Sequence, residues 1–217
     1  MKLCKKNRWF LGCSVEKRIQ PNIEILRDCG ITDQKLSMIR RLDPSLIIQK
    51  AEALKALISR VENLGVARTS GTFPNTLKAL HMVSEKNFNA HLEFCKGFGW
   101  SEDDFLAAFR KAPTLVGVSL KSLQRKMEFL VNEAGCAPSY LALRPLMLLM
   151  SLEKRLMPRH RIVTGLKSRG VCISNLSISS YMSYPEKTFL EKLVNCYKEY
   201  PELIELYNAA PKHRTAL

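Results

Sequence analysis

The sequence has no apolar run long enough to span a membrane. Its longest, Leu141 to Leu152, is about a dozen residues and is interrupted by Arg144 and Pro145, so it predicts a buried helix. Near the N-terminus, Trp9-Phe10-Leu11 is too short to form the apolar core of a secretory signal. We therefore expect a protein that is neither embedded in a membrane nor secreted.

Motifs for metal, nucleotide or covalent chemistry are also missing. The seven cysteines, at positions 4, 13, 29, 95, 136, 172 and 196, form no C-x-x-C pair and no zinc-like cluster with the four histidines. Their odd number and irregular spacing predict reduced thiols that pack as small apolar residues. No convincing strand is predicted, so no glycine-rich loop follows one. We expect no catalytic residue, metal, cofactor or small-molecule substrate.

Acidic residues are scarce relative to basic ones. The 217 residues include 34 Lys and Arg against 20 Asp and Glu, which gives a net charge of +14 and a pI near 9.6. From Lys154 to Pro185 there is no acidic residue, and six basic residues crowd the first half of this segment. A solvated helix usually carries charges of both signs, so a segment with only positive charges favours contact with phosphates. Nucleic acid is thus favoured over an anionic membrane surface as the partner.

A glycine recurs at nearly constant intervals. Gly30, Gly65, Gly99, Gly135 and Gly170 are separated by 35, 34, 36 and 35 residues, and each ends an apolar stretch with helical periodicity. Glycine readily adopts the left-handed conformation that follows a helix, so each predicts a helix end. A fixed period of this size is typical of helical-repeat proteins.

Prolines subdivide the repeat. Pro44 and Pro113 lie 14 residues after a repeat glycine, whereas Pro74 and Pro145 lie 9 and 10 residues after theirs. Apolar residues stand 3, 10 and 17 residues beyond both Pro44 and Pro113, a heptad spacing that forms one stripe along a helix. They are Ile47, Leu54 and Val61 in one repeat and Val116, Leu123 and Leu130 in the other. Each repeat therefore predicts a short helix, a proline break and a longer helix ending at the glycine.

Two serines give the clearest helix starts. Ser101 precedes Asp104 in a capping-box arrangement, and the helix predicted over 103–111 must end before Pro113. Ser119 predicts a second helix, with Leu123, Met127 and Leu130 on its buried face. Such helices cannot bury their apolar faces alone, so we expect an all-α chain whose repeats stack as an α-solenoid superhelix. The aromatic residues Trp100, Phe105, Phe109 and Phe129 are expected in its core.

Basic residues recur near the proline of the repeat. Arg41 and Arg110 each precede their proline by three residues, and Arg144 directly precedes Pro145. A cation at a helix C-terminus can simply complement the helix dipole, for about 0.3–1 kcal/mol, and this alternative stays open for each residue. The other interpretation is contact with phosphates. The candidate nucleic-acid-binding residues are Arg41, Arg110, Lys111, Arg144, Lys154, Arg155, Arg159 and Arg161.

The repeat resembles that of the mTERF family, the mitochondrial transcription termination factor-like proteins of organelles. The period near 35, the proline inside the repeat and the leucines seven apart are similar to that family. Four segments are similar to its land-plant branch: CKGFGWSEDDFLAAFRKAPTLV (95–116), MEFLVNEAG (127–135), RPLMLLMSLEKRLMPR (144–159) and FLEKLVNCYKEYPELIELY (189–207). The resemblance covers residues 14–208, including SVEKRIQP at 14–21, which returns as SLEKRLMP at 151–158.

This resemblance implies a left-handed superhelix that binds double-stranded DNA or structured RNA in its groove, chiefly through Arg and Lys contacts to phosphates. By position it favours Arg41, Arg110 and Arg144, and then the 154–161 cluster. The implied function is transcription termination or regulation in a mitochondrion or chloroplast, with RNA processing or intron splicing as a variant. The protein is expected to be a monomer.

The resemblance also predicts the domain organisation. We expect a basic N-terminal remnant at 1–13, a repeat domain at 14–208 with repeat ends near the five glycines, and a C-terminal tail at 209–217. The chain begins within a repeat at Ser14, whereas members of the family carry further repeats and a transit peptide upstream. No transit peptide is evident, and a truncated N-terminus is the expectation.

Three other classes of function stay open from the residues alone. Pentatricopeptide proteins have repeats of similar length and bind single-stranded RNA, but the internal proline and the lack of a recurring polar pair argue against that class. In a protein-interaction scaffold of the HEAT type, the basic face would be incidental. An enzyme is disfavoured because the histidines, His81, His91, His160 and His213, have no nearby residues arranged as a triad.

Overall fold

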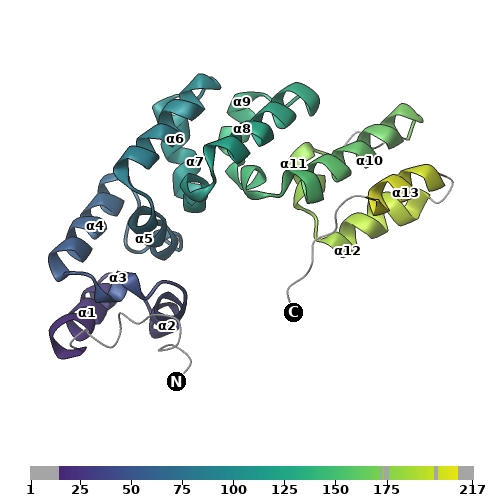
Figure 1. Ribbon diagram of the computed structural model, residues 1–217. Coiled ribbons are helices and arrows are strands. Elements are labelled where there is room, and N and C mark those ends of the chain that lie inside the picture. Colours follow the sequence, from purple (N-terminus) through teal and green to yellow (C-terminus); the bar gives the residue numbers. More distant parts are fainter. Residues whose placement is uncertain (1–14, 172, 174–175, 198–199, 210–217) are drawn as a thin grey trace. The chain divides into compact units, whose positions relative to one another are not determined.

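The protein is all-α, as the sequence predicts. The computed structural model describes residues 15–171, 173, 176–197 and 200–209, without the side chains of residues 38, 40–42, 203, 206 and 208. Every regular element in these ranges is a helix (Figure 1). Two compact units divide the chain, Met1–Gly97 with Ser101–Gly117, and Phe98–Trp100 with Val118–Leu217. Within the described ranges, no helix is both long and apolar enough to cross a membrane.

In the first unit, neighbouring helices pack through apolar faces. Phe88 makes edge-to-face contacts with Phe105 and Phe109, at ring-centroid distances of 5.4 and 5.1 Å, and these contacts join α6 to α7. The 3₁₀ helix η3 lies against α5 and α6. The elements of this unit are η2 (Val15–Ile19), α1 (Gln20–Asp28), α2 (Asp33–Leu42), α3 (Ser45–Ile48), α4 (Ala51–Asn63), α5 (Phe73–Met82), α6 (Glu85–Gly97), α7 (Glu102–Lys111) and η3 (Pro113–Gly117).

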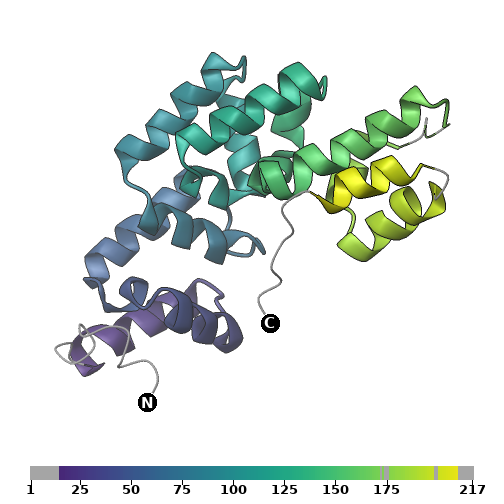
Figure 2. The same cartoon turned by 45° about the vertical axis from the view of Figure 1, so that its right-hand side comes forward.

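In the second unit, long helices alternate with short ones. The π-helical turn η6 runs directly into α10, and α13 lies along α10 in both views (Figures 1 and 2). The turn η4 similarly continues α8. The elements are α8 (Leu120–Glu128), η4 (Phe129–Glu133), α9 (Pro138–Leu143), η5 (Pro145–Leu149), η6 (Leu152–Leu156), α10 (Met157–Ser168), α11 (Ile178–Ser183), α12 (Glu186–Phe189), η7 (Leu190–Val194), η8 (Asn195–Tyr197) and α13 (Pro201–Asn208).

The repeat glycines end the long helices as predicted. Their φ angles are +74°, +78°, +87°, +68° and +78°, in the left-handed region that residues with a Cβ rarely adopt. At Gly65 the N–H of Val66 donates to the carbonyl oxygen of Val61 over 3.3 Å, which satisfies an otherwise unpaired acceptor at the end of α4. Each long helix therefore stops at a position fixed by one glycine.

The prolines begin new helical segments rather than simply breaking old ones. Pro113 and Pro145 start the 3₁₀ helices η3 and η5. Pro74 lies in the first turn of α5, and residues 66–72 contain no helix. The predicted position of the proline break is therefore wrong for the repeat that ends at Gly99, because the short helix α5 begins at the proline and the break before the long helix α6 lies at Val83 and Ser84. The physical reason is that proline is tolerated in a first turn, where its missing N–H needs no partner.

The predicted core residues are buried. All six members of the two heptad stripes are at most 2% exposed, and the four aromatic residues expected in the core are at most 5% exposed. The capping box is present, with Asp104 N–H donating to Ser101 Oγ and Ser101 N–H donating to Asp104 Oδ2, each over 3.0 Å. Helix α7 begins one residue earlier than predicted, at Glu102.

Three of the four cysteines in the described ranges pack in the core as small apolar residues. Cys29, Cys95 and Cys136 are buried free thiols, and burial raises the pKa of Cys95 to about 12. Cys196 is exposed, so the prediction of a packed thiol is wrong there. Cys4, Cys13 and Cys172 lie outside the described residues, as do the predicted N-terminal remnant and residues 210–217 of the tail.

Candidate nucleic-acid interface

Helix geometry separates the basic residues that lie together in the sequence. The segment from Leu152 to Ser168 is one continuous helix made of η6 and α10, and successive side chains on a helix point about 100° apart. Its basic residues therefore cannot share one face. Lys154, Arg161 and Lys167 are exposed, Arg155 is half-buried and Arg159 is buried.

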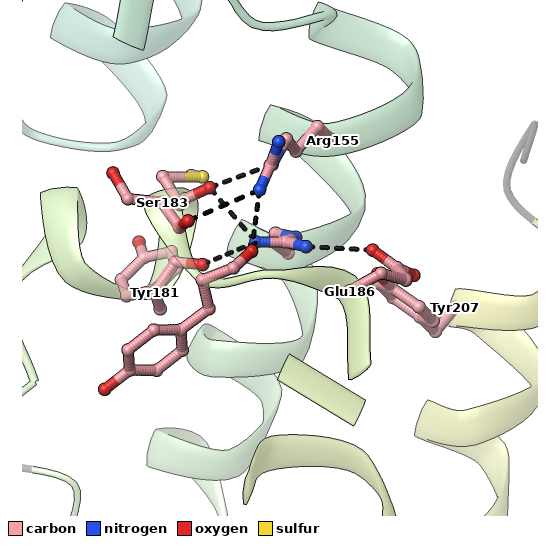
Figure 3. A network of polar contacts seen from close by, with 8 residues as sticks. Arg155, Tyr181, Ser183, Glu186 and Tyr207 are labelled. Carbon is pink, nitrogen blue, oxygen red and sulfur yellow. Dashed lines mark hydrogen bonds and ion pairs between the residues drawn. The ribbon is translucent and has the colours of Figure 1, made fainter. Parts of the chain in front are cut away.

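Arg159 lies beneath the end of α11 and is only 1% exposed. Its Nη2 donates to Glu186 Oε2 over 2.8 Å, and its guanidinium stacks on the ring of Phe189 at 4.5 Å. Its Nη1 donates to the carbonyl oxygens of Tyr181, Met182 and Tyr184, over 3.0, 3.0 and 2.6 Å (Figure 3). A phosphate cannot reach a guanidinium that is enclosed in this way, so we leave Arg159 out of the candidate interface.

Arg155, one helical turn before Arg159, donates hydrogen bonds to two of the same carbonyl groups. Its Nε donates to the carbonyl oxygen of Met182 over 2.9 Å, and its Nη2 donates to that of Tyr184 over 2.6 Å (Figure 3). Burial lowers the pKa of Arg155, and the nearby charge of Arg159 lowers it further. The last carbonyl groups of a helix have no partner within that helix, so these two arginines stabilise the end of α11. Arg155 is therefore also a structural residue.

Two further buried donors act in the same way, and the sequence analysis did not identify them. Asn22 Nδ2 donates to the carbonyl oxygens of Ile47 and Gln49, over 2.7 and 2.8 Å, at the end of α3. Lys126 Nζ donates to the carbonyl oxygen of Leu148 over 2.9 Å, in η5. Burial lowers the pKa of Lys126, against a smaller opposite effect of Glu153. In each case a longer helix holds the end of a short helix further along the chain.

The distance of each donor from the start of its helix is a sequence signal that could have revealed these residues. Lys126 lies seven residues after the N-cap Ser119, and Arg159 lies eight residues after the N-cap Ser151. The extra residue falls in the π-helical turn η6, where each turn holds more residues than an α-helix. Asn22 follows SVEKRIQP as Arg159 follows SLEKRLMP. The repeated segment is thus a signal for inter-helix packing.

The candidates near the other prolines differ from one another. Arg110 is half-buried and its Nε donates to the carbonyl oxygen of Leu64 over 2.9 Å, which satisfies an acceptor at the end of α4. The acceptor belongs to another helix, whereas the alternative interpretation has the cation complement the C-terminus of its own helix, α7. Lys111 is exposed. The side chain of Arg41 lies outside the described residues, although its backbone is part of α2.

Arg144 is exposed and held in place by neutral groups. Its guanidinium carbon lies 4.3 Å from the centre of the Tyr140 ring, and its Nε donates to Ser179 Oγ over 3.1 Å. The hydroxyl of Tyr140 also donates to Ser179 Oγ, over 2.9 Å. This arrangement joins α9 to α11 and keeps one guanidinium plane in a fixed orientation at the surface.

The exposed cations of the long helix form the best candidate surface for a polyanion. Lys154 and Arg161 are seven residues apart on this helix, about 10 Å apart along its axis, and both are exposed. Neither side chain has a hydrogen-bond or ion-pair partner among the described residues. By contrast, Arg125 pairs with Glu153 at 2.7 Å and Arg169 pairs with Glu202 at 2.6 Å. An unpaired cation keeps its full attraction for a phosphate.

Comparison with known proteins identifies relatives of the chain. The model of the mTERF family matches residues 1–190. The chain is 24% identical to the chloroplastic transcription termination factor MTERF8 of Arabidopsis thaliana over 179 residues, covering 82% of this chain and 35% of that protein. It is 22% identical to the mitochondrial transcription termination factor MTERF15 of the same plant, covering 87% of this chain and 42% of that protein.

A shorter and closer match extends this picture. Over 93 residues the chain is 32% identical to the mitochondrial transcription termination factor MTEF18 of Arabidopsis thaliana, covering 43% of this chain and 17% of that protein. The chain therefore spans less than half the length of each of these three relatives. No solved structure gives a significant match.

Proposed function

Because the chain belongs to the mTERF family, we propose that it is a nucleic-acid-binding regulator of organellar gene expression that acts in transcription termination or a related step. The observation that carries this proposal is the distribution of charge on the helix formed by η6 and α10. Lys154, Arg161 and Lys167 are exposed there, and no acidic residue occurs between Lys154 and Pro185. No catalytic chemistry is part of the proposal.

Double-stranded nucleic acid is the proposed ligand class. A duplex carries one phosphate charge per roughly 1.7 Å of its axis, so a rigid helix with cations about 10 Å apart meets phosphates on either strand. The phosphate contacts proposed here come from Lys154, Arg161 and Arg144, and Lys167 joins them because it is exposed on the same helix. Lys111 and Arg41 remain candidates in the first unit. Phosphate contacts position a protein without selecting a sequence, so DNA and structured RNA are both suitable.

The proposed compartment is an organelle. The chloroplastic and mitochondrial names of the three relatives support this placement but divide between the two compartments. The test is to express the natural gene with a fluorescent tag at its C-terminus and to compare its signal with markers of both organelles. A diffuse signal outside both would contradict the proposal.

A protein-interaction scaffold is the second candidate function, favoured by one observation. Leu143 and Leu146 are 59% and 58% exposed and lie three residues apart in the sequence, at the junction of α9 and η5. Exposed leucines are more typical of a protein contact than of a phosphate contact. If they form such a contact between copies of the chain, the Leu143→Ser/Leu146→Ser variant lowers the molar mass measured by light scattering. We propose instead that the protein is a monomer, for which wild type and variant have equal mass.

The experiment that tests nucleic-acid binding is a salt titration of the full chain. Labelled random-sequence duplex DNA, duplex RNA and single-stranded RNA are titrated by fluorescence anisotropy at 50–200 mM salt. Binding through phosphates predicts that log K falls linearly with log salt, by about 0.9 per phosphate contact on duplex DNA. The proposal also predicts tighter binding to a duplex than to a single strand. Absent binding, or binding indifferent to salt, would contradict it.

A further inference from the structure

We propose that Tyr140 and Ser179 are positioning residues. They hold the guanidinium of Arg144 in the orientation in which it donates two hydrogen bonds to one phosphodiester group of the bound nucleic acid. This inference rests on the proposed function, because it names how one residue of that interface engages its ligand. It assigns roles to a tyrosine of α9 and a serine of α11, neither of which is basic.

Two contacts fix the orientation of the arginine. The guanidinium carbon stacks 4.3 Å from the centre of the Tyr140 ring, which restricts the tilt of the plane. Ser179 Oγ accepts from Arg144 Nε over 3.1 Å, which restricts rotation within the plane. The serine is itself fixed, because its backbone N–H donates to the hydroxyl oxygen of Tyr140 over 3.2 Å and that hydroxyl donates to Ser179 Oγ over 2.9 Å.

These contacts leave the outer edge of the guanidinium available. They use Nε and one face, and neither Nη atom has a hydrogen-bond partner among the described residues. The side chain is exposed, so this edge is open to a ligand from solvent. Two parallel N–H groups on a guanidinium match two oxygens of a phosphate, which is the reason arginine binds such groups with two hydrogen bonds.

The neutral character of the two holding groups distinguishes Arg144 from the exposed arginines that carboxylates orient. Arg27, Arg68 and Arg169 are oriented by the carboxylates of Asp33, Glu62 and Glu202, at 2.6–2.8 Å. A carboxylate fixes an arginine but also neutralises it, so a phosphate must compete with the carboxylate. Tyrosine and serine orient Arg144 without neutralising its charge. The side chain therefore loses little rotamer freedom when it binds, and it keeps its full attraction for an anion.

The position of Ser179 is in turn secured by the rest of α11. Ser177 caps this helix, with its Oγ accepting from the N–H of Ser180 over 3.2 Å. The other end is held from below by Arg155 and Arg159, which donate to its last carbonyl groups. These two arginines thus contribute to the interface indirectly, by fixing the helix that carries Ser179.

Four variants of the full chain test this inference on random-sequence duplex DNA. Arg144→Ala removes the contact and makes the log–log salt slope shallower by about 0.9. Ser179→Ala and Tyr140→Leu keep the charge, so the slope stays near that of wild type while affinity falls about 2- to 10-fold, as expected for one newly mobile side chain. Ser180→Ala is the matched control, because its hydroxyl contacts Ser177 rather than Arg144, and it should bind as wild type does.

A second readout reports on positioning without any ligand. The Nε–H group of Arg144 is hydrogen-bonded in wild type, so its NMR signal in protein labelled with ¹⁵N-arginine should exchange slowly with water. In Ser179→Ala that exchange should be faster, and in Ser180→Ala it should be unchanged. Circular dichroism of each variant establishes that the chain remains folded. Arg144→Lys keeps the positive charge but loses the planar pair of N–H groups, so it should resemble Ser179→Ala in binding.

The outcomes separate this inference from the proposed function. If wild type does not bind any duplex, the proposed function fails and this inference falls with it. If wild type binds with a steep salt slope but Arg144→Ala binds equally well, or Ser179→Ala matches Ser180→Ala in both readouts, the inference alone is overturned. A loss confined to one DNA sequence among several would show that Arg144 reads a base and would overturn the phosphodiester contact.

Discussion

Lys154 and Arg155 are neighbours in the sequence, yet they point to different sides of one helix. Lys154 is exposed, whereas Arg155 donates to the carbonyl oxygen of Met182 over 2.9 Å. The same contrast separates Arg161 from Arg159 two residues earlier. The long helix that follows Ser151 therefore has a buried side, whose arginines secure α11, and an exposed basic side, which we propose binds nucleic acid.

Loss of Arg159 should destabilise the protein strongly. Arg159→Ala removes a buried cation together with its hydrogen bonds to the carbonyl oxygens of Tyr181, Met182 and Tyr184 and its ion pair with Glu186, so we expect the free energy of unfolding to fall by about 3–5 kcal/mol. Arg125→Ala is the control, since its ion pair with Glu153 is exposed and should contribute less than about 1 kcal/mol. Urea denaturation measures both. Similar losses in the two variants would show that the buried network contributes little.

The repeat glycines should tolerate alanine poorly, for conformational reasons alone. Gly135 has φ +68°, and a methyl group at its Cα would meet open space, so Gly135→Ala should lower the free energy of unfolding by about 1–2 kcal/mol through backbone strain. Gly97, in α6, also faces open space but has no positive φ, so Gly97→Ala should be neutral or stabilising by up to about 1 kcal/mol. Thermal denaturation distinguishes the opposite signs, and equal effects would contradict this account.

Stability should decrease on mild acidification because of His160. Burial lowers the pKa of His160 from its usual value of 6.5, so the unfolded chain takes up a proton at a pH where the folded chain does not. The contribution of His160 to the free energy of unfolding is therefore fully present above about pH 6.5, and it declines as the pH falls towards the lower pKa of the folded state. His160→Gln should show a shallower decline between pH 7.5 and 5.5 in urea denaturation. An unchanged pH dependence in the variant would exclude His160 as its source.

Glu202 should weaken nucleic-acid binding by neutralising Arg169. The pair is 2.6 Å long, and Arg169 also stacks on Tyr200 at 5.3 Å. Glu202→Gln frees this cation next to the proposed interface, so affinity for duplex DNA should rise and the salt slope should steepen by up to about 0.9. Glu205→Gln, on the same helix, changes the net charge equally, and Glu205 has no ion-pair partner among the described residues. The increase in affinity should therefore be larger for Glu202→Gln than for Glu205→Gln, and equal increases would show that the ion pair with Arg169 does not limit binding.

The repeat and its helices were predictable because their signals are local. Each of the five glycines sets a helix end through its own backbone, and the heptad stripe from Ile47 to Val61 follows from helical periodicity alone. Pro74 was misplaced because proline is compatible with a helix break and equally with a helix start, and composition does not distinguish the two.

The candidate interface was only partly predictable. The one-signed segment correctly located a basic helix, but the turn η6 is π-helical, so the usual period misjudges which later residues point inward. Arg159 is buried for that reason, together with an acceptor set on α11 that no local pattern reveals. Ser179 could not be related to Arg144 from the sequence, because the two are 35 residues apart and meet only through helix packing.

The most direct test of the account is the salt slope of Lys154→Ala/Arg161→Ala on duplex DNA. The matched control, Lys55→Ala/Lys86→Ala, also removes two exposed positive charges, from α4 and α6, where acidic residues are interspersed. If both side chains contact phosphates, the slope should be shallower by about 1.8 for the first pair, with little change for the control. Equal changes in the two double variants, or none in the first, would show that the exposed cations of this helix do not contact phosphates.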